Sequence, residues 1–168
     1  MRLNSISAFA ALLISGLSVA GCTSDTATPH AGTAPAAAAS APAAIPAGTE
    51  PAIAHYLEVR AALANDDLEA AKKAAEPGKS DAAPFGADET KIAGAADLKA
   101  ARAAFSDLSK AMIPYAKEHA SATFYVFECP MSMQPFGQWL QAEEQLKNPY
   151  RGKEMPTCGS KVDTIAKK

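Results

Sequence analysis

The chain has 168 residues, of which 48% are hydrophobic and 20% are charged. This length accommodates one domain of ordinary size with a modest core. Its 16 Lys and Arg residues nearly balance its 18 Asp and Glu residues, and the basic residues form no cluster or stripe. The charge pattern therefore argues against nucleic acid as a partner.

The N-terminus has the composition of an export signal. Met1 and Arg2 precede an apolar stretch over 6–20 that is interrupted only by Ser and Gly and is too short to span a membrane. Residues 17–22 (LSVAGC) resemble the lipobox of bacterial lipoproteins. We therefore expect a lipoprotein signal peptide at 1–21 and a lipidated Cys22. An ordinary secretory peptide cleaved nearby is the alternative, and both interpretations export the chain.

Lipidation at Cys22 predicts a membrane anchor, because several acyl chains hold a protein on a bilayer stably. Thr23 stands where retention in the inner membrane usually requires Asp, so the lipobox resemblance implies an outer-membrane lipoprotein that faces the periplasm. Residues 22–48 are then expected to form a disordered tether, composed almost only of Ala, Pro, Thr, Ser and Gly, with a single isoleucine and no aromatic residue. For the 26 residues from 23 to 48, random-coil scaling gives a reach of roughly 30 Å.

The folded domain is expected over 49–168, beginning with helices. Glu50 and Pro51 open a helix whose apolar residues keep helical spacing to Ala64. Asp66 is the predicted N-cap of a short second helix that ends near Ala75. Residues 76–84 contain Pro-Gly and are expected to form a loop.

A longer third helix follows Gly94. Asp97 is its predicted N-cap, and one apolar stripe runs from Leu98 to Tyr115. Pro114 is expected to kink this helix or nearly end it.

The C-terminal third carries the strand signals. Residues 122–128 (ATFYVFE) are rich in aromatic and β-branched side chains and predict a strand. A helical turn or two is expected over 136–146 around Trp139, and residues 148–152 (NPYRG) predict a turn. A second short strand over 158–162 would pair with the first and bring Cys158 towards Cys129.

Two cysteines and three methionines gather in this region, within thirty residues: Cys129, Met131, Met133, Met155 and Cys158. Thiolates and thioethers are the soft donors that suit Cu(I). On an extended segment the first three share one face, and the spacing of three between the last two aligns them on one side of a turn. The pattern therefore allows one metal site assembled from two chain segments.

A structural disulfide between Cys129 and Cys158 is the competing interpretation. Exported thiols meet an oxidising compartment, and such a bridge contributes about 3.5 kcal/mol by loop-entropy scaling. Methionines around a bridge also fill irregular gaps well. From the residues alone both interpretations remain open.

Zinc and catalysis are not indicated. The sequence has no CxxC motif, and His30, His55 and His119 lie outside the sulfur cluster. It has no phosphate loop, HExxH motif or nucleophile-and-base arrangement, and Cys129 has no adjacent base in the sequence. We therefore expect a binding protein and not an enzyme.

Several short motifs stand out along the folded part of the chain. In the C-terminal part they are Cys129-Pro130-Met131, Trp139-Leu140, Asn148-Pro149-Tyr150 with Gly152, and Met155 with Cys158-Gly159; in the helical part they are Tyr56-Leu57 and the stretch from Asp97 through Arg102 and Phe105 to Ser109. Together these motifs resemble the DUF3347 family. The family is exported, and it resembles a domain appended to some copper/silver efflux adaptors. Many members have His before the Cys-Pro-Met motif, where this chain has Glu128.

The resemblance implies a mainly α fold: a small antiparallel helical bundle with a C-terminal lobe whose short β-hairpin carries Cys129 and Cys158. It also implies a role in handling copper. We expect a Cu(I) buffer or chaperone linked to metal efflux or tolerance, with Cys129, Met131, Met133, Met155 and Cys158 as ligands. The alternative is a disulfide-stapled module, without metal, that docks on an efflux adaptor or another envelope protein.

Overall fold

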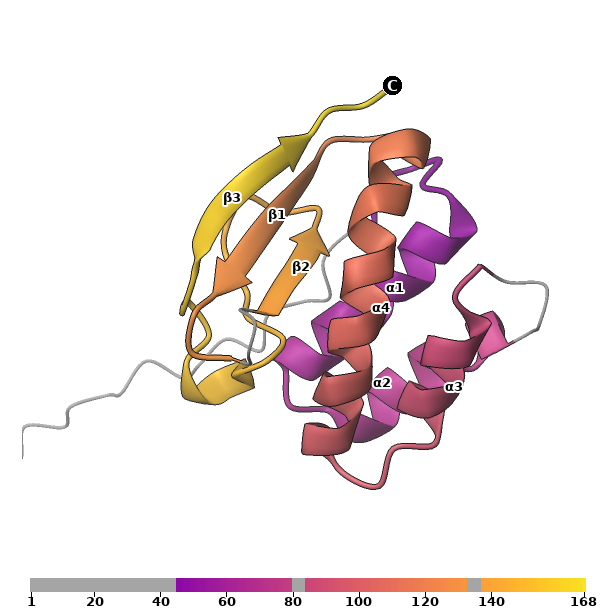
Figure 1. The fold of residues 1–168 in the computed structure, drawn as a ribbon, viewed down its shortest axis with the longest axis vertical. Coiled ribbons are helices and arrows are strands. Elements are labelled where there is room, and N and C mark those ends of the chain that lie inside the picture. Colours follow the sequence, from indigo (N-terminus) through magenta and orange to yellow (C-terminus); the bar gives the residue numbers. More distant parts are fainter. Residues whose placement is uncertain (1–44, 80–83, 133–136) are drawn as a thin grey trace, which may run out of the picture. The chain divides into compact units, whose positions relative to one another are not determined.

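A computed structural model of the protein describes residues 45–79, 84–132 and 137–168. In this part of the chain, four helices precede a sheet of three strands (Figure 1). The mainly helical fold with a C-terminal lobe is confirmed. The predicted signal peptide, Cys22, the tether up to residue 44, Met133 and Phe136 lie outside the described residues.

Helix α1 (Pro51–Ala64) has the predicted bounds. The Glu50 carboxylate caps it by accepting hydrogen bonds from the backbone N–H groups of Ala52 at 3.0 Å and Ile53 at 3.3 Å. Pro51 fits the first turn, because that position has no intrahelical partner for an N–H.

Helix α2 (Leu68–Ala75) begins one residue later than the predicted cap implied. The Asp67 side chain is the cap, accepting a hydrogen bond from the Ala70 N–H at 2.9 Å. Asp66 instead takes a left-handed conformation with φ of 56° in the turn between the helices. Its carboxylate is therefore free to bind elsewhere, and it pairs with Arg102.

Helix α3 (Gly86–Ala93) follows the short 3-10 turn η1 (Pro77–Lys79) and was not expected from the sequence. Its eight residues (GADETKIA) are mostly polar or small, and no side chain caps its start. Packing against α4 stabilises it, with Ile92 fully buried. Packing against α4 therefore stabilises a helix whose own sequence is too weak a helix former to predict it.

Helix α4 (Leu98–His119) begins at the predicted cap, where Asp97 accepts a hydrogen bond from the Ala100 N–H at 2.7 Å. It continues five residues beyond Pro114, so the proline does not end the helix. Pro114 is exposed, and the carbonyl group that loses its partner there can be hydrated.

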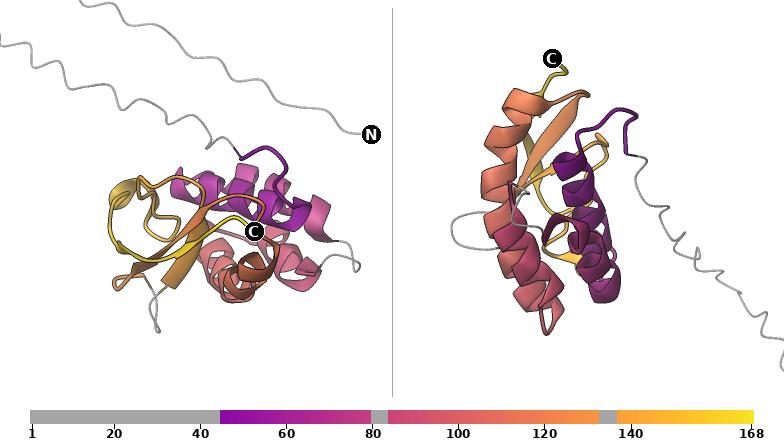
Figure 2. Two further views of the ribbon diagram at one scale, coloured as in Figure 1. Left: turned by 90° about the horizontal axis from the view of Figure 1, so that it is seen from above. Right: turned by 90° about the vertical axis from the view of Figure 1, so that its right-hand side faces the viewer.

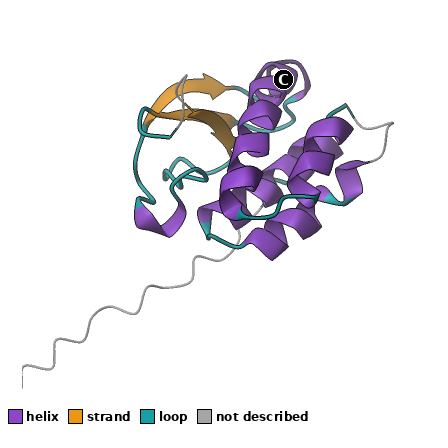
Figure 3. Ribbon diagram, turned by 60° about the horizontal axis from the view of Figure 1, so that its bottom comes forward, coloured by secondary structure: helices purple, strands orange, loops and turns teal. Residues whose placement is uncertain are grey.

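The sheet contains β1 (Phe124–Cys129), β2 (Gly137–Gln141) and β3 (Ser160–Ile165) in the antiparallel order β2-β1-β3. The predicted pairing of the first strand with the last is confirmed, and β3 is displaced from the expected 158–162. The strands lie to one side and the helices to the other, with α1 and α4 against β2 (Figure 2; Figure 3).

Strand β2 corrects the helical turn expected over 136–146. Trp139 pairs with Phe127 of β1 and stacks on its ring, with 5.7 Å between centroids. Gln141 then holds the following loop: its amide donates to the carbonyls of Glu143 and Gln145 at 2.6 and 2.8 Å. Strand pairing and this buried side chain therefore override the helical spacing of the apolar residues.

The core joins the helices to the sheet through Tyr56, which is fully buried. Its hydroxyl lies 2.8 Å from the Ser109 hydroxyl of α4 and accepts a hydrogen bond from the Leu140 N–H of β2 at 3.0 Å. Burial raises the pKa of Tyr56 far above its usual value.

None of the helices in the described ranges is long and apolar enough to cross a membrane.

Glu89 of α3 is a buried acid beside a cavity of about 180 Å³. The cavity is also lined by Glu50 and His55, and Gly78 lies so close that an added Cβ would meet the Glu89 carboxylate. Among the residues that the structure describes, its Oε2 atom has no hydrogen-bond partner. Burial raises the pKa of Glu89 to about 7, so the folded protein holds a proton on this side chain that an unfolded chain releases.

We predict that Glu89→Gln removes a pH dependence of stability. Between about pH 4.5 and 7 the folded state binds more protons than the unfolded state, so stability falls as the pH rises through this range. Urea unfolding at pH 5 and pH 8 should show a loss on the order of 2 kcal/mol in the wild type that the variant lacks. Glu58→Gln, at an exposed position of α1, is the control, and equal losses in all three proteins would contradict the prediction.

Candidate functional site

Cys129 and Cys158 meet at the end of the sheet, as the sequence predicts. Cys129 is the last residue of β1 and is fully buried, whereas Cys158 is half-buried in the loop before β3. Both are free cysteines, and their Sγ atoms lie 3.0 Å apart within hydrogen-bonding contact. Two segments that are 29 positions apart in the sequence thus form one dithiol.

A serine turn shapes the chain immediately after Cys129. The Cys129 carbonyl accepts hydrogen bonds from the Ser132 hydroxyl at 2.7 Å and the Ser132 N–H at 3.3 Å. The same hydroxyl oxygen accepts a hydrogen bond from the Gly137 N–H, which begins β2, at 2.9 Å. The turn fixes the backbone on which Met131 lies.

Gly159 permits the close approach of the two cysteine-bearing segments. Its φ is +135°, and an added Cβ would lie 2.6 Å from the backbone oxygen of Glu128. A side chain at this position would therefore push β3 away from β1 directly beside the thiol pair.

The loop between Asn148 and Cys158 is organised by the side chain of Asn148. Its Oδ1 accepts hydrogen bonds from the N–H groups of Tyr150 and Arg151, and its Nδ2 donates to the Cys158 carbonyl. This role was not predicted from the sequence, although Asn-Pro at the start of a turn is the signal that indicates such side-chain bonds to the backbone.

Tyr150 packs beneath the cysteine lobe, between helix and sheet. Its ring lies 5.7 Å from that of Phe105 in α4 and 5.9 Å from that of Trp139 in β2, measured between centroids. Its hydroxyl donates to the Gln138 carbonyl at 2.7 Å. Burial raises the pKa of Tyr150 to about 12, so the hydroxyl remains a donor.

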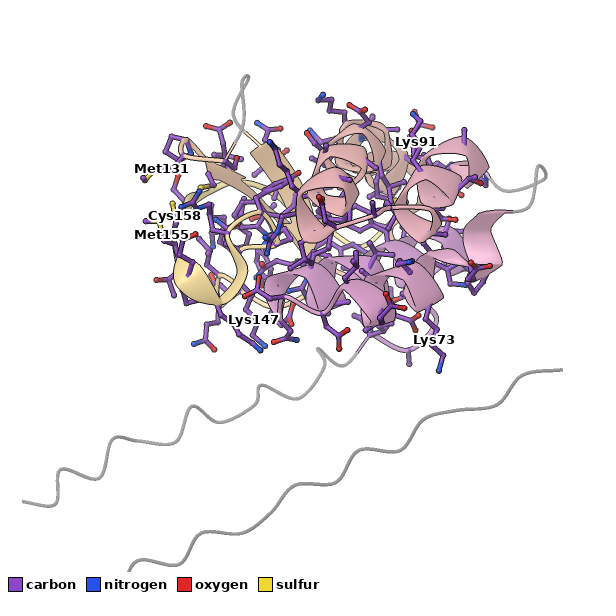
Figure 4. All side chains as sticks on the ribbon, turned by 90° about the horizontal axis from the view of Figure 1, so that it is seen from below. Lys73, Lys91, Met131, Lys147, Met155 and Cys158 are labelled. Atoms are coloured by element: carbon purple, nitrogen blue, oxygen red, sulfur yellow. The ribbon has the colours of Figure 1, made fainter. Side chains whose placement is uncertain are left out.

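Figure 4 shows Met131 and Met155 at the same end of the domain as Cys158. Met131 follows Cys129 by two residues, and the Met155 carbonyl accepts a hydrogen bond from the Cys158 N–H at 3.2 Å. The side chain of Met131 is 59% exposed, and Met155 is half-buried. Met112 is fully buried in the core and takes no part in this group, as its place on the apolar stripe predicts. The structure therefore brings four of the five predicted ligands to one region, and the fifth, Met133, lies outside the described residues.

Cys158 holds its proton more firmly than an ordinary thiol. Its hydrogen bond to Cys129 is the main cause of the raised pKa, with burial and the charge of Cys129 adding to it and Arg151 opposing it. A metal ion must displace this proton, because the thiolate is the ligand. Metal binding at this pair is therefore coupled to pH.

The sulfur atoms have no carboxylate or imidazole cluster beside them in the described ranges, where no group of three or more His, Cys, Asp and Glu side chains is arranged to hold a metal ion. Glu128 accepts a hydrogen bond from the Gln138 amide at 2.8 Å, and strand alternation places it on the opposite face from Cys129. His119 stacks on Tyr115 of α4, with 4.2 Å between ring centroids. The donors that gather here are soft sulfur ligands.

The helical part has a recognisable family. Residues 52–123 match DUF3347, which is described as a protein of unknown function. This segment belongs to the DUF3347 family. The match ends one residue before β1, so the resemblance proposed for the C-terminal motifs lies outside it. No curated protein and no solved structure matches the chain.

The DUF3347 segment holds the cysteine-bearing loop through a polar contact. Arg102 of α4 donates from Nε to the Pro149 carbonyl at 2.8 Å and pairs with the Asp66 carboxylate. The other oxygen of Asp66 accepts a hydrogen bond from the Lys153 N–H at 2.9 Å. Gly152, with φ of +54°, leaves room for this pair, because an added Cβ would overlap both side chains.

We predict that Gly159→Ala destabilises the lobe more than Gly48→Ala destabilises the start of the domain. Both glycines have positive φ. A Cβ at position 48 would meet no described atom within 4 Å, whereas a Cβ at position 159 would clash with the backbone oxygen of Glu128, which cannot move aside. We expect Gly48→Ala to cost about 1 kcal/mol of unfolding free energy from strain, and Gly159→Ala about 1–3 kcal/mol more from the clash. Urea unfolding measures both, and equal losses would contradict the prediction.

Proposed function

We propose that the protein binds Cu(I), or a similar soft metal ion, through the thiolates of Cys129 and Cys158. Thioethers of Met131, Met155 and Met133 complete the ligand set. The observation that carries this proposal is the 3.0 Å contact between the two Sγ atoms, with Met131 two residues from Cys129 and Met155 three residues from Cys158 at the same end of the domain (Figure 4). Cu(I) takes a small number of soft ligands, and this group offers thiolates and thioethers together.

The two thiols can bind one metal ion after a small increase in the distance between their Sγ atoms. Metal–thiolate bonds of about 2.3 Å, as in zinc sites, place two sulfurs on one ion about 3.8 Å apart at a tetrahedral angle and about 4.6 Å apart at a linear angle. The present contact of 3.0 Å must therefore open on loading. Cys158 is the half-buried partner, on a loop, so the required movement falls on its side of the pair and leaves buried Cys129 in the sheet.

The exposure of the methionines favours a buffer or chaperone. Met131 is 59% exposed and Met155 half-buried, so an ion held here would be reachable by the ligands of another protein. The raised pKa of Cys158 disfavours a thiol nucleophile, because the attacking species is the thiolate. These features support a binding protein and not an enzyme.

The proposed site of action is the periplasmic face of the outer membrane. This part of the proposal rests on the export signal, the lipobox ending in Cys22 and the Ala/Pro-rich residues that follow it. A tether of this kind lets the domain reach partners near the membrane surface. A copper efflux adaptor, or another envelope protein, is the proposed partner.

Competition titration with a Cu(I) chelator tests the metal site on the reduced protein. We expect the Cys129→Ser, Cys158→Ser double variant to lose at least a hundredfold in affinity. Met131→Leu and Met155→Leu should lose less, and Met112→Leu, in the core, is the matched control and should match the wild type. Affinity should rise with pH, because binding releases the Cys158 proton. Unchanged affinity in the double variant would rule out the proposed ligands.

A disulfide-stapled interaction module is the second candidate. It is favoured by the same sulfur contact, because an exported dithiol at this distance is readily oxidised. In this case the bridge only holds the lobe closed, and the domain surface binds an envelope partner.

Mass spectrometry of protein isolated from the periplasm without reductant separates the two candidates. We expect free thiols or bound copper in the major species if the metal site is used. A quantitative Cys129–Cys158 bridge that resists mild reductant would instead establish the staple. Alkylation before lysis prevents oxidation during purification from imitating that result.

A further inference from the structure

Asn148 is a fully buried polar residue, and its hydrogen bonds to described residues all remain within the loop that carries Met155 and Cys158. Its Nδ2 donates to the Cys158 carbonyl at 2.6 Å, and its Oδ1 accepts from the N–H groups of Tyr150 at 2.8 Å and Arg151 at 3.0 Å. Its backbone N–H donates to the Pro156 carbonyl, and its carbonyl accepts from the Gly152 N–H.

These bonds close the loop upon itself at the position of the thiol. Strand β3 begins at Ser160, so Cys158 lies before the β1–β3 ladder. Its own N–H bonds locally, to the Met155 carbonyl at 3.2 Å. The Asn148 amide, in contrast, reaches Cys158 across ten positions of sequence and joins it to the base of the loop.

We propose that Asn148 is a positioning residue that holds the Cys158 thiol against Cys129. It acts through the backbone of Cys158 and does not touch the sulfur atoms or a bound ion. In the context of the proposed function, it preorganises the soft-metal site. The role does not depend on copper, because it sets the effective concentration of one thiol beside the other and so governs any reaction that needs both.

The equilibrium constant for oxidation of the two thiols tests the positioning role, because a loss of folding stability alone would not change this constant. Oxidised glutathione accepts two electrons from the pair: the Cys129–Cys158 bond forms, the glutathione disulfide bond breaks, and the two cysteine protons pass to two glutathione thiols. The equilibrium constant of this exchange measures how closely the thiols are held. Loosening Cys158 should lower this constant.

The test uses the full chain with Cys22→Ala, so that the pair supplies its remaining thiols. Asn148→Asp keeps the oxygen acceptor but loses the donor to Cys158, and Asn148→Ser is the second variant. We expect the constant to fall about tenfold in each, equivalent to about 30 mV. Circular dichroism and urea unfolding establish that the variants compared are folded.

Tyr150→Phe is the matched control. Tyr150 lies in the same loop as Asn148, and the substitution removes the hydrogen bond from its hydroxyl to the Gln138 carbonyl of β2 while the bond from Asn148 to Cys158 stays intact. We expect its oxidation constant to stay within twofold of the parent, even where its stability falls. A folded Asn148→Asp or Asn148→Ser protein with a constant within twofold of the parent would overturn the proposal, as would an equal loss in Tyr150→Phe.

Cu(I) competition on the same proteins separates this inference from the proposed function. We expect the Asn148 variants to bind Cu(I) about tenfold more weakly than the parent. If the parent does not bind Cu(I) while the Asn148 variants still shift the thiol equilibrium, the copper function fails and the positioning role stands. If the parent binds Cu(I) and the Asn148 variants change neither quantity, the positioning role fails and the copper function stands.

Discussion

The buried ring and hydroxyl of Tyr56 connect the parts of this domain. From Tyr56 a series of ring contacts passes through Phe105, Tyr150 and Trp139 to Phe127, with centroids between 5.0 and 5.9 Å apart at each step. This series starts in α1, crosses α4 and ends on β1, two residues before Cys129. The cysteine lobe is therefore packed onto the DUF3347 helices by large apolar surfaces, which dominate core energetics.

Apolar packing fixes the position of the buried Cys129 thiol but does not by itself fix the position of the Cys158 thiol. Cys129 is held by its place in β1, whereas Cys158 is half-buried and follows residues 153–157, which are mostly exposed. Polar contacts hold the loop that carries Cys158: Asn148 bonds within the loop, and Arg102 and Asp66 bond to it from the helical part. One thiol therefore lies on a strand and the other on a hydrogen-bonded loop, and both proposals, the metal site and the disulfide staple, rest on this arrangement.

The elements with complete local signals were predictable. Helices α1 and α4 have caps and an apolar stripe, and β1 has a run of aromatic and β-branched residues. Two elements were not predictable from local pattern. The apolar residues around Trp139 fit helical spacing as well as strand pairing, and the ladder with β1 decides for the strand. Helix α3 is too short and too polar to form without its contacts with α4.

The sequence by itself determined the caps and apolar stripes of α1 and α4, the strand β1, the match of residues 52–123 to DUF3347, and the strand pairing that brings Cys158 to Cys129, because composition, periodicity and turn residues act locally. Only the tertiary structure decided which thiol is buried, how far apart the sulfurs lie, and that Asn148, Arg102 and Asp66 shape the loop. Those properties depend on contacts between segments distant in the chain, where the choice of partner is set by packing and by the need to satisfy buried polar groups.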